Sequence, residues 1–485
     1  MPKNPFNLRI ILKFIGFVLL IEALFMLLTS GIAWLYNESD VHIFLQAAAI
    51  TCVSALVLTL LGHKGSAVVG KHEGFVIVTL VWILFPLFGS IPYVLSPYFQ
   101  SFTDAYFESI SGFSSTGATI LTDVEVLPKC MLFWRSISQW LGGMGIILLS
   151  LAIFPVLKLG SFQLFTAETT GPVYEKLRPK LSESAKIMWF VYCGLTILEA
   201  LLLWLGKMDF FDALCHAFTT MATGGFSTKN ASLGYWDSVY IDIVGIVFMF
   251  LAGTSVVVLY RLFTRNFDKV RQNEEFKWYA IVFVISGLAL SALLFAIDKM
   301  PAGKALCNGF FQAISIITTS GYFTDNVALW NPVAKFLLLL LVCMGAMSGS
   351  TSGGIKIGRH IIYIKAAYNE LQRDVHPNAI LPIMYNGKAL PASTVSNLYG
   401  FLVFYILITA LSMGIYYSMG LNMEEALSVS LSALGNVGPA MGDFTQHYAL
   451  MPCLGKWWMC FLMLVGRLEI FTILLLLSRN FWKKA

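Results

Sequence analysis

The sequence predicts an all-α polytopic membrane protein with four tandem membrane–pore-loop–membrane repeats behind two N-terminal transmembrane helices. Of its 485 residues, 57% are hydrophobic and only 12% are charged, which is about half the charged fraction of a soluble domain. Many apolar runs exceed the roughly 18 residues that a helix needs to cross a bilayer. Four short polar segments with a glycine recur between pairs of these runs, as expected for an internal repeat.

Two apolar runs come first, at residues 8–36 and 42–62. The first is too long for the apolar core of a signal peptide and lacks an A-x-A-like site, so we interpret it as a retained span. The order of span, short segment, span and basic connector then repeats four times. The predicted flanking spans are 73–97 and 128–156, 185–205 and 236–262, 277–298 and 331–366, and 395–419 and 455–478. The predicted units are 1–66 for the N-terminal pair and 67–160, 161–268, 269–375 and 376–485 for the repeats.

The four short segments share one spacing, which becomes visible when each is aligned on a glycine. These glycines are Gly117, Gly225, Gly321 and Gly438. Thirteen residues earlier stands a side chain suited to cap a helix or complement its dipole, namely Asp104, Asp212, Asn308 or Glu425. Six residues before the glycine is a hydroxyl residue: Ser111, Thr219, Ser315 or Ser432. Two residues before it the side chain is always polar: Ser115, Thr223, Thr319 or Asn436.

The length of these segments suits a helix that enters the membrane and returns. About twelve residues of helix span roughly 18 Å, about half of a 30 Å hydrocarbon core. An extended return at that depth is tolerated only if it is buried in protein or faces water. Four such returns around one axis, freed at glycine to adopt positive φ, can present carbonyl oxygens that replace the hydration shell of a monovalent cation. The alternative is four loops that merely pack the bundle, which the matched glycines disfavour.

Lysine and arginine placement predicts the orientation. One set of connectors and termini holds 23 of these residues, and the opposite set holds 8. Cytoplasmic loops carry the excess of positive charge. We therefore expect both termini in the cytoplasm and the four short segments entering from outside.

The chain resembles the TrkH/KtrB superfamily of potassium transporters, and within it the TrkH type. The resemblance covers nearly the whole chain. It rests on "TDAYFESISGFSSTGAT", "FDALCHAFTTMATGGFST", "FQAISIITTSGYFT", "LSALGNVGPAMG", "QWLGGMGII", "AETTGPV", "MSGSTSGGIKIGR" and "VGRLEIFTILLLL". It implies a potassium-channel-like fold and transport of potassium, with rubidium accepted. The implied potassium-binding residues are Ser115, Thr116, Gly117, Thr223, Gly224, Gly225, Thr319, Ser320, Gly321, Asn436, Val437 and Gly438.

The stretch "CMGAMSGSTSGGIKIGR" interrupts the predicted second span of repeat three. Residues 345–354 contain four glycines, three serines and a threonine, a poor helix by propensity. Packing of small residues spaced by four is one interpretation; a loop beneath the four returns is the favoured one, and the resemblance implies an intramembrane gating loop. Its candidate gating residues are Gly345, Gly349, Ser350, Thr351, Gly353 and Gly354.

Arg467 is a further gating candidate. It lies about eleven residues from either end of the predicted last span, too deep to reach the membrane surface, so we expect it to face a polar interior. Glu469, two residues on, points to another side of the helix. The resemblance implies that Arg467 lines the pore near the loop as a barrier to cations, and an ion pair with another helix is the alternative.

Three other titratable residues lie in or beside the spans. Glu199 and Asp242 are candidates for proton coupling, although a buried hydrogen-bonding role is favoured for each. His216 is a candidate pH sensor, and a packed histidine of the second re-entrant helix is the favoured interpretation.

The implied function is potassium uptake across the bacterial cytoplasmic (inner) membrane. An inside-negative potential contributes about 2.3 kcal/mol per 100 mV, enough for roughly 50-fold accumulation at about 1.4 kcal/mol per decade. The sequence has no Walker A motif, which excludes ATP hydrolysis by that route. The resemblance also implies a homodimer and a cytosolic TrkA-like ring of nucleotide- and NAD-binding subunits, which the basic connectors 158–186, 261–277 and 356–388 could dock. We expect the lipid bilayer as environment, no bound cofactor and no nucleic-acid partner.

Two alternative functions remain. A sodium- or proton-coupled symporter with broken helices predicts inverted halves, whereas these repeats run parallel. An intramembrane enzyme is suggested only by "GSTSG" at 349–353, whose centre is Thr351 rather than serine and which has no histidine in a nearby span.

Overall fold

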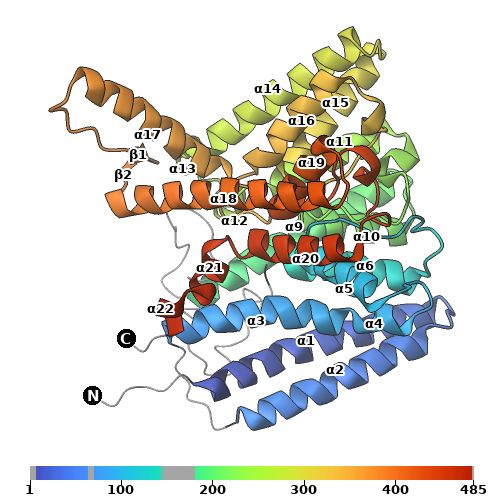
Figure 1. Cartoon of the computed structure of the whole chain (residues 1–485). Helices are drawn as coiled ribbons and strands as arrows, with labels where there is room; N and C mark the ends of the chain where they lie inside the picture. The colour runs from blue at the N-terminus through green and yellow to red at the C-terminus, as the bar shows by residue number, and fades with distance from the viewer. Residues whose placement is uncertain (1–6, 64–69, 144, 146–180, 483–485) are drawn as a thin grey trace, which may run out of the picture.

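The protein is described here by a computed structural model that covers residues 7–63, 70–143, 145 and 181–482. It is mostly helical (Figure 1). Helices α1 (Leu8–Leu35) and α2 (Val41–Leu61) pack on each other and form one side of the bundle, with α1 also contacting the first repeat. Six described helices are long and apolar enough to cross a membrane, or eight if each of two bent pairs is one span. The prediction of a multi-pass membrane protein is confirmed.

Each repeat contains a first helix, a short re-entrant helix and a second helix. Repeat one has α3 (Lys71–Gly89), α4 (Ile91–Leu95), α5 (Phe102–Phe113) and α6 (Lys129–Gly143). Repeat two has α9 (Leu181–Leu205), α10 (Phe210–Met221), η2 (Ser232–Trp236), α11 (Val239–Ala252) and α12 (Val256–Phe263), and α13 (Phe267–Arg271) follows. Repeat three has α14 (Glu274–Ala296), α15 (Ala302–Ile317), η3 (Val327–Leu329), α16 (Pro332–Met344) and α17 (Ile357–Val375).

A small hairpin precedes the fourth repeat. Strands β1 (Met384–Tyr385) and β2 (Lys388–Ala389) pair antiparallel beside α17, which projects from the bundle (Figure 1). Repeat four has α18 (Ala392–Ser418), α19 (Met423–Gly435), η4 (Gly442–Phe444), α20 (Cys453–Arg467), α21 (Phe471–Leu477) and α22 (Arg479–Trp482).

The re-entrant helices and the second helices alternate around a closed circuit. Helix α6 packs between α5 and α10, α11 between α10 and α15, α16 between α15 and α19, and α20 between α19 and α5. Every second helix therefore contacts the re-entrant helix of its own repeat and that of the next. This cyclic order brings the four re-entrant segments together and confirms the predicted fold class.

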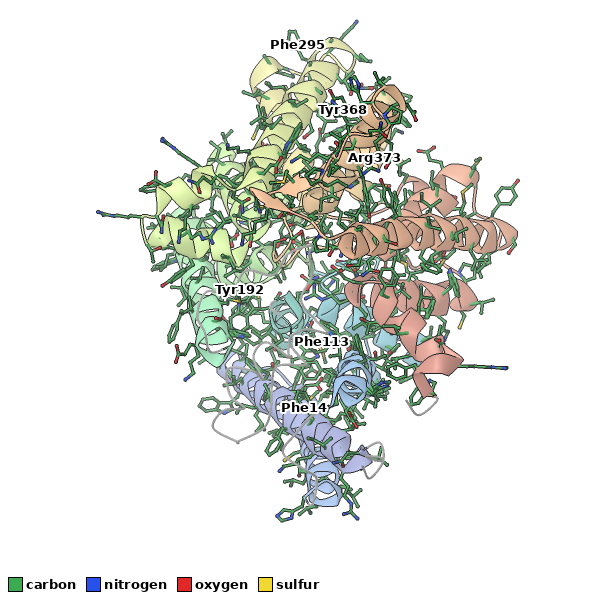
Figure 2. The ribbon with its side chains drawn as sticks, turned by 90° about the vertical axis from the view of Figure 1, so that its left-hand side faces the viewer. Phe14, Phe113, Tyr192, Phe295, Tyr368 and Arg373 are labelled. Carbon is green, nitrogen blue, oxygen red and sulfur yellow. The ribbon has the colours of Figure 1, made fainter. Side chains whose placement is uncertain are left out.

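The interior of the first repeat is packed with aromatic rings. Phe113, at the end of α5, lies inside the bundle (Figure 2). Its ring contacts Phe85 at 4.7 Å and Trp134 at 6.2 Å between centroids. Trp134 also donates a hydrogen bond to the Gly89 carbonyl at 3.0 Å. These contacts fix the end of α5, where the return begins.

Two predicted spans differ from expectation because they are broken. The second span of repeat two bends by 108° between α11 and α12, and that of repeat four bends by 110° between α20 and α21. In repeat four the break is made by two ordinary residues, Glu469 and Ile470, at φ 53° and 48°. Hydropathy is continuous across such a break, so the expectation of one unbroken span was wrong in both repeats. The later part of the predicted span 128–156 lies outside the described residues.

Three of the four expected helix-start residues lie in the first turn, as third helical residues rather than as caps: Asp104, Asp212 and Glu425. There they complement the helix dipole, while the capping side chains are Ser101, Asp209 and Asn422. The expectation for Asn308 was wrong, because α15 begins earlier, at Ala302. Asn308 instead accepts a hydrogen bond from the Thr324 hydroxyl at 3.1 Å and thereby ties the helix to its own return.

Candidate ion pathway

All four re-entrant helices end in the same hydrogen-bonded turn. The polar residue two before each glycine adopts a left-handed conformation, with φ of 56° at Ser115, 51° at Thr223, 58° at Thr319 and 53° at Asn436. The next N–H then donates to the carbonyl of the hydroxyl residue, from Thr116 to Ser111 at 2.9 Å, Gly224 to Thr219 at 2.9 Å, Ser320 to Ser315 at 2.8 Å and Val437 to Ser432 at 2.9 Å. This is the Schellman pattern of a helix C-terminus, and it explains the spacing seen in the sequence.

The four glycines form a closed ring. They adopt positive φ of 81° at Gly117, 76° at Gly225, 75° at Gly321 and 102° at Gly438. A Cβ added to any of them would collide with a carbonyl oxygen of the next repeat. The pairs are Gly117 with Gly224, Gly225 with Ser320, Gly321 with Val437, and Gly438 with Thr116. The fourth contact returns to the first repeat, so eight of the twelve predicted residues form this circuit.

One cavity opens on the glycine side of this ring. All four glycines line it, together with residues of the returns such as Thr122, Asn230 and Gln446. Asn230 ties the returns of repeats one and two, since its side-chain amide donates to the Asp123 carboxylate at 2.7 Å. This bond and one from the Glu125 backbone N–H hold the pKa of Asp123 below its ordinary value. A negative charge is thereby kept beside the cavity.

The polar side chains two before each glycine are bonded beneath the ring. Ser115 donates to the Gln139 carbonyl at 3.4 Å, and Thr223 lies 3.2 Å from the Thr351 hydroxyl. Thr319 accepts from the Gly353 N–H at 2.9 Å. Asn436 donates to the Met463 carbonyl at 3.0 Å. The side chain two residues before each ring glycine therefore anchors its return to a second helix or to the loop beneath the ring. This role explains why the residue at that position is polar in all four repeats.

The second span of repeat three is interrupted between Met344 and Ile357. Positive φ at Gly345, Gly349 and Gly354, of 66°, 77° and 75°, turns the chain there. The Thr351 hydroxyl donates to the Met221 carbonyl at 3.2 Å, and a Cβ at Gly353 would collide with the Gly435 carbonyl. The loop therefore lies against the ends of the re-entrant helices, on the side of the ring opposite the cavity. Ser350 bonds within the loop, to Met347 and Ser352.

Arg467 joins this loop to the first repeat. Its guanidinium donates to the Thr351 carbonyl at 3.2 Å, to the Gly143 carbonyl at 3.0 Å, and to the Gly142 carbonyl. The guanidinium also lies 5.0 Å from the ring centre of Trp82. Arg467 thus faces a polar interior, at the end of α20. Glu469 forms its ion pair elsewhere, with Arg359.

The other three candidates lie outside the ring. His216 is buried in α10, with ring nitrogens 2.7 Å from the Asp212 carbonyl and 3.0 Å from the Ser227 hydroxyl. Asp242 accepts a weak hydrogen bond from the Cys307 thiol at 3.5 Å. Glu199 is fully buried near Thr220, and neither carboxylate oxygen has a hydrogen-bond partner within the described part of the chain.

Sequence reasoning missed a buried ion pair behind the ring. Arg135 is one of the 8 lysines and arginines on the side predicted to be external, but it is 2% exposed and its Nε donates to Glu108 at 2.8 Å. Glu108 also accepts from the Ile120 N–H at 3.0 Å, and Arg135 donates to the Ser227 carbonyl at 3.1 Å. The pair holds the returns of repeats one and two. The sequence signal was a second carboxylate in the re-entrant segment, Glu108, four residues after Asp104.

Comparisons with known proteins agree with this architecture. The profile of the TrkH family, described as a cation transport protein, matches residues 40–484. The Trk system potassium uptake protein TrkH of Escherichia coli K12 is 35% identical over 482 residues, covering 99% of this chain and 100% of that protein. The TrkH of Halomonas elongata is 34% identical over 483 residues, covering 99% of this chain and 100% of that protein.

A solved structure gives the same result in three dimensions. The crystal structure of the potassium transporter TrkH from Vibrio parahaemolyticus superposes with a TM-score of 0.88 at 33% identity, covering 99% of this chain and 100% of that chain. Sequence and fold therefore agree over the full length, and the chain belongs to the TrkH family of cation transport proteins, which are membrane transporters and not enzymes.

Proposed function

We propose that the chain takes up potassium ions through the ring of four returns. The observation that carries this proposal is the closed circuit of glycine-to-carbonyl contacts between successive repeats. The oxygens in that circuit belong to Thr116, Gly224, Ser320 and Val437, and carbonyl rings of this kind replace the hydration shell of a potassium ion. Four helix C-termini end at the ring, and their partial negative charge favours a cation there. The names of the similar proteins, which are potassium uptake proteins, support the choice of ion.

The loop between Met344 and Ile357 is proposed as the gate, in a closed position. It occupies the side of the ring opposite the cavity, and Arg467 holds it through the Thr351 carbonyl. The positive charge of Arg467 adds an electrostatic barrier to cations at the same place. Opening requires the loop to break two bonds, that from Arg467 to the Thr351 carbonyl and that from the Gly353 N–H to Thr319, while Arg467 keeps its bonds to Gly142 and Gly143.

Membrane potential is proposed as the driving force, with both termini in the cytoplasm of a bacterial inner membrane. The distribution of lysine and arginine supports this orientation. The same order of helices in all four repeats supports parallel repeats rather than the inverted halves of a coupled carrier.

A homodimer and a cytosolic TrkA-like ring of regulatory subunits are proposed as partners. Helix α17 carries a stripe of exposed apolar side chains, namely Ile364 at 66%, Tyr368 at 60%, Leu371 at 66% and Val375 at 71% exposed. Tyr368 and Arg373 mark this projecting helix in Figure 2. An exposed apolar stripe of this kind marks an interaction surface, and we propose that α17 of a second copy packs against it. The basic connectors 158–186, 261–277 and 356–388 are the proposed docking region for the regulatory ring, and residues 158–180 of the first lie outside the described residues.

Rubidium uptake in cells that lack their own potassium uptake tests the function. Expression should restore rubidium uptake that potassium inhibits and sodium does not. Gly321→Ser should reduce this discrimination, because its side chain would enter the place of the Val437 carbonyl. Gly303→Ser is the matched control in the same repeat, since a Cβ there has no neighbour within 4 Å. Absence of rubidium uptake, or equal inhibition by sodium and potassium in the unaltered protein, would overturn the proposal.

A further inference from the structure

We propose that Gln139 is a positioning residue that sets ion selectivity through the carbonyl of Gly224. This inference rests on the proposed function of the ring. Gln139 lies on α6 of repeat one and is fully buried. Its Nε2 donates to the Gly224 carbonyl at 2.8 Å, and its Oε1 accepts from the Phe226 N–H at 3.1 Å. One side-chain amide thus pairs with the backbone of repeat two on both sides of Gly225.

Gln139 makes the ring asymmetric. Of the four ring oxygens, in the part of the chain that the structure describes, only that of Gly224 accepts a hydrogen bond from a side chain. In repeats three and four, side chains donate to carbonyls that come after the ring oxygen in the chain. Ser315 donates to the Tyr322 carbonyl at 2.7 Å, and Tyr448 donates to the Gly438 carbonyl at 2.7 Å. A donor at Gly224 fixes the direction of that oxygen and draws part of its electron density away from the ion.

The sequence of repeat two differs from the other repeats at the residue that contacts Gln139. The other repeats place threonine, serine or valine before the ring glycine, at Thr116, Ser320 and Val437, whereas repeat two places a second glycine there. Gly224 does not have the positive φ of Gly225, so backbone conformation does not require it. A Cβ at Gly224 would lie 2.5 Å from Oε1 and 2.7 Å from Nε2 of Gln139. The glycine is therefore explained by the space that the glutamine amide occupies.

Selectivity depends on how many carbonyl oxygens face the ion and on the field that they exert. Without the amide, the Gly224 oxygen is free to turn, because the bonds to Arg135 and Asp123 hold the return of repeat two further along, at Ser227 and Asn230. We therefore expect loss of Gln139 to weaken discrimination between large and small alkali ions more than it weakens transport.

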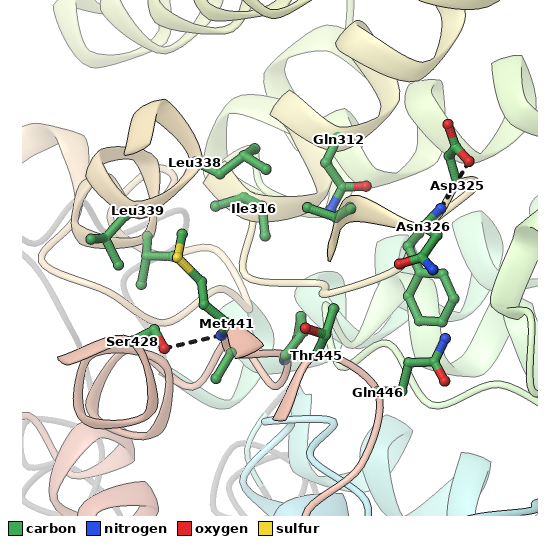
Figure 3. A pocket seen from close by; sticks show the side chains of 15 residues that line it. Gln312, Ile316, Asp325, Asn326, Leu338, Leu339, Ser428, Met441, Thr445 and Gln446 are labelled. Carbon is green, nitrogen blue, oxygen red and sulfur yellow. Dashed lines mark hydrogen bonds between the residues drawn. The ribbon is translucent and has the colours of Figure 1, made fainter. Parts of the chain in front are cut away.

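The test compares Gln139→Met and Gln139→Glu with a matched buried glutamine, Gln312→Met. Methionine keeps the length and removes both bonds; ionised glutamate keeps the acceptor for Phe226 and removes the donor to Gly224. Gln312 is 3% exposed on α15 and lines a second pocket, between α15, α16 and the return of repeat four, which adjoins the cavity at the ring (Figure 3). Within the described residues Gln312 makes no hydrogen bond to the ring, and its Oε1 has no partner.

The readout is the ratio of rubidium to sodium uptake at equal amounts of membrane protein. Both Gln139 variants lack the bond to the Gly224 carbonyl and should lower this ratio roughly 2- to 10-fold, the range expected for loss of that bond, while Gln312→Met should leave it unchanged. Gly224→Ala should lower the ratio by displacing the amide, and the same change should add little in a Gln139→Ala background. An unchanged ratio in folded Gln139 variants would overturn the inference. Failure of the unaltered protein to prefer rubidium would instead overturn the proposed function.

Discussion

Replacement of Arg467 by alanine tests the gate most sharply. The guanidinium contacts three carbonyl oxygens, but only that of Thr351 belongs to the loop, whereas Gly142 and Gly143 belong to repeat one. Displacement of the loop therefore breaks one charge-assisted hydrogen bond, which is worth about 1.5–3 kcal/mol. At about 1.4 kcal/mol per decade, Arg467→Ala should raise the displaced population roughly 10- to 100-fold.

The assay is rubidium uptake into liposomes that contain the purified chain and no partner subunit. Arg467→Lys separates two roles of the side chain, because lysine keeps the charge but cannot span three carbonyls as the planar guanidinium does. A latch predicts fast uptake for both variants, whereas a purely electrostatic barrier predicts fast uptake for alanine alone. Arg373→Ala is the control, since Arg373 is exposed on α17 and pairs with Glu370 three residues away.

A smaller change in the same loop gives a graded comparison. Thr351→Val removes the hydroxyl that bonds to the Met221 carbonyl and the Thr223 hydroxyl. We expect an increase in uptake of about 2- to 10-fold, since uncharged hydrogen bonds contribute about 0.5–1.5 kcal/mol. The gate assignment would be refuted if Arg467→Ala, correctly folded and inserted, transported no faster than the unaltered protein.

Three further predictions concern stability, pH and assembly. Arg135→Met should destabilise the protein by about 3–5 kcal/mol because it leaves Glu108 buried without its partner. Adding Glu108→Gln to this variant should restore most of the thermal stability in detergent. Equal melting temperatures for the single and double variants would contradict this explanation. Because the pKa of Asp123 is lowered, its bond to Asn230 contributes fully above the ordinary pKa of 3.8 and is lost as the pH falls through the lowered pKa. Protease resistance of this loop should therefore be constant between about pH 5 and 8. A change in resistance within that window would contradict the assignment. Leu371→Cys should cross-link two copies in membranes under mild oxidation, whereas Arg373→Cys, about 200° around the same helix, should not; equal yields would argue against a dimer through α17.

The repeated spacing of glycine and hydroxyl residues predicted much of the fold. That spacing can be recognised in the sequence because it belongs to a local hydrogen-bonded turn. Ser111 supplies the accepting carbonyl, Ser115 adopts the left-handed conformation, and Gly117 allows the backbone of the next repeat to approach closely. Each requirement is set by residues within six positions of one another. Local backbone chemistry of this kind does not depend on distant parts of the chain.

The parts that the sequence did not predict depend on distant or unmarked residues. Gln139 meets Gly224 across 85 residues, and Arg135 meets Glu108 across a return whose path the sequence does not define. The bend after α20 is made by Glu469 and Ile470, neither of which is a turn-forming residue type, so hydropathy alone predicts a continuous span.

The most direct measurement is the position of a rubidium ion in crystals of this protein, located from its anomalous scattering. A rubidium peak on the common axis, within coordinating distance of the carbonyl oxygens of Thr116, Gly224, Ser320 and Val437, is the predicted result. A peak away from that axis, or none there at a concentration that saturates uptake, would contradict it.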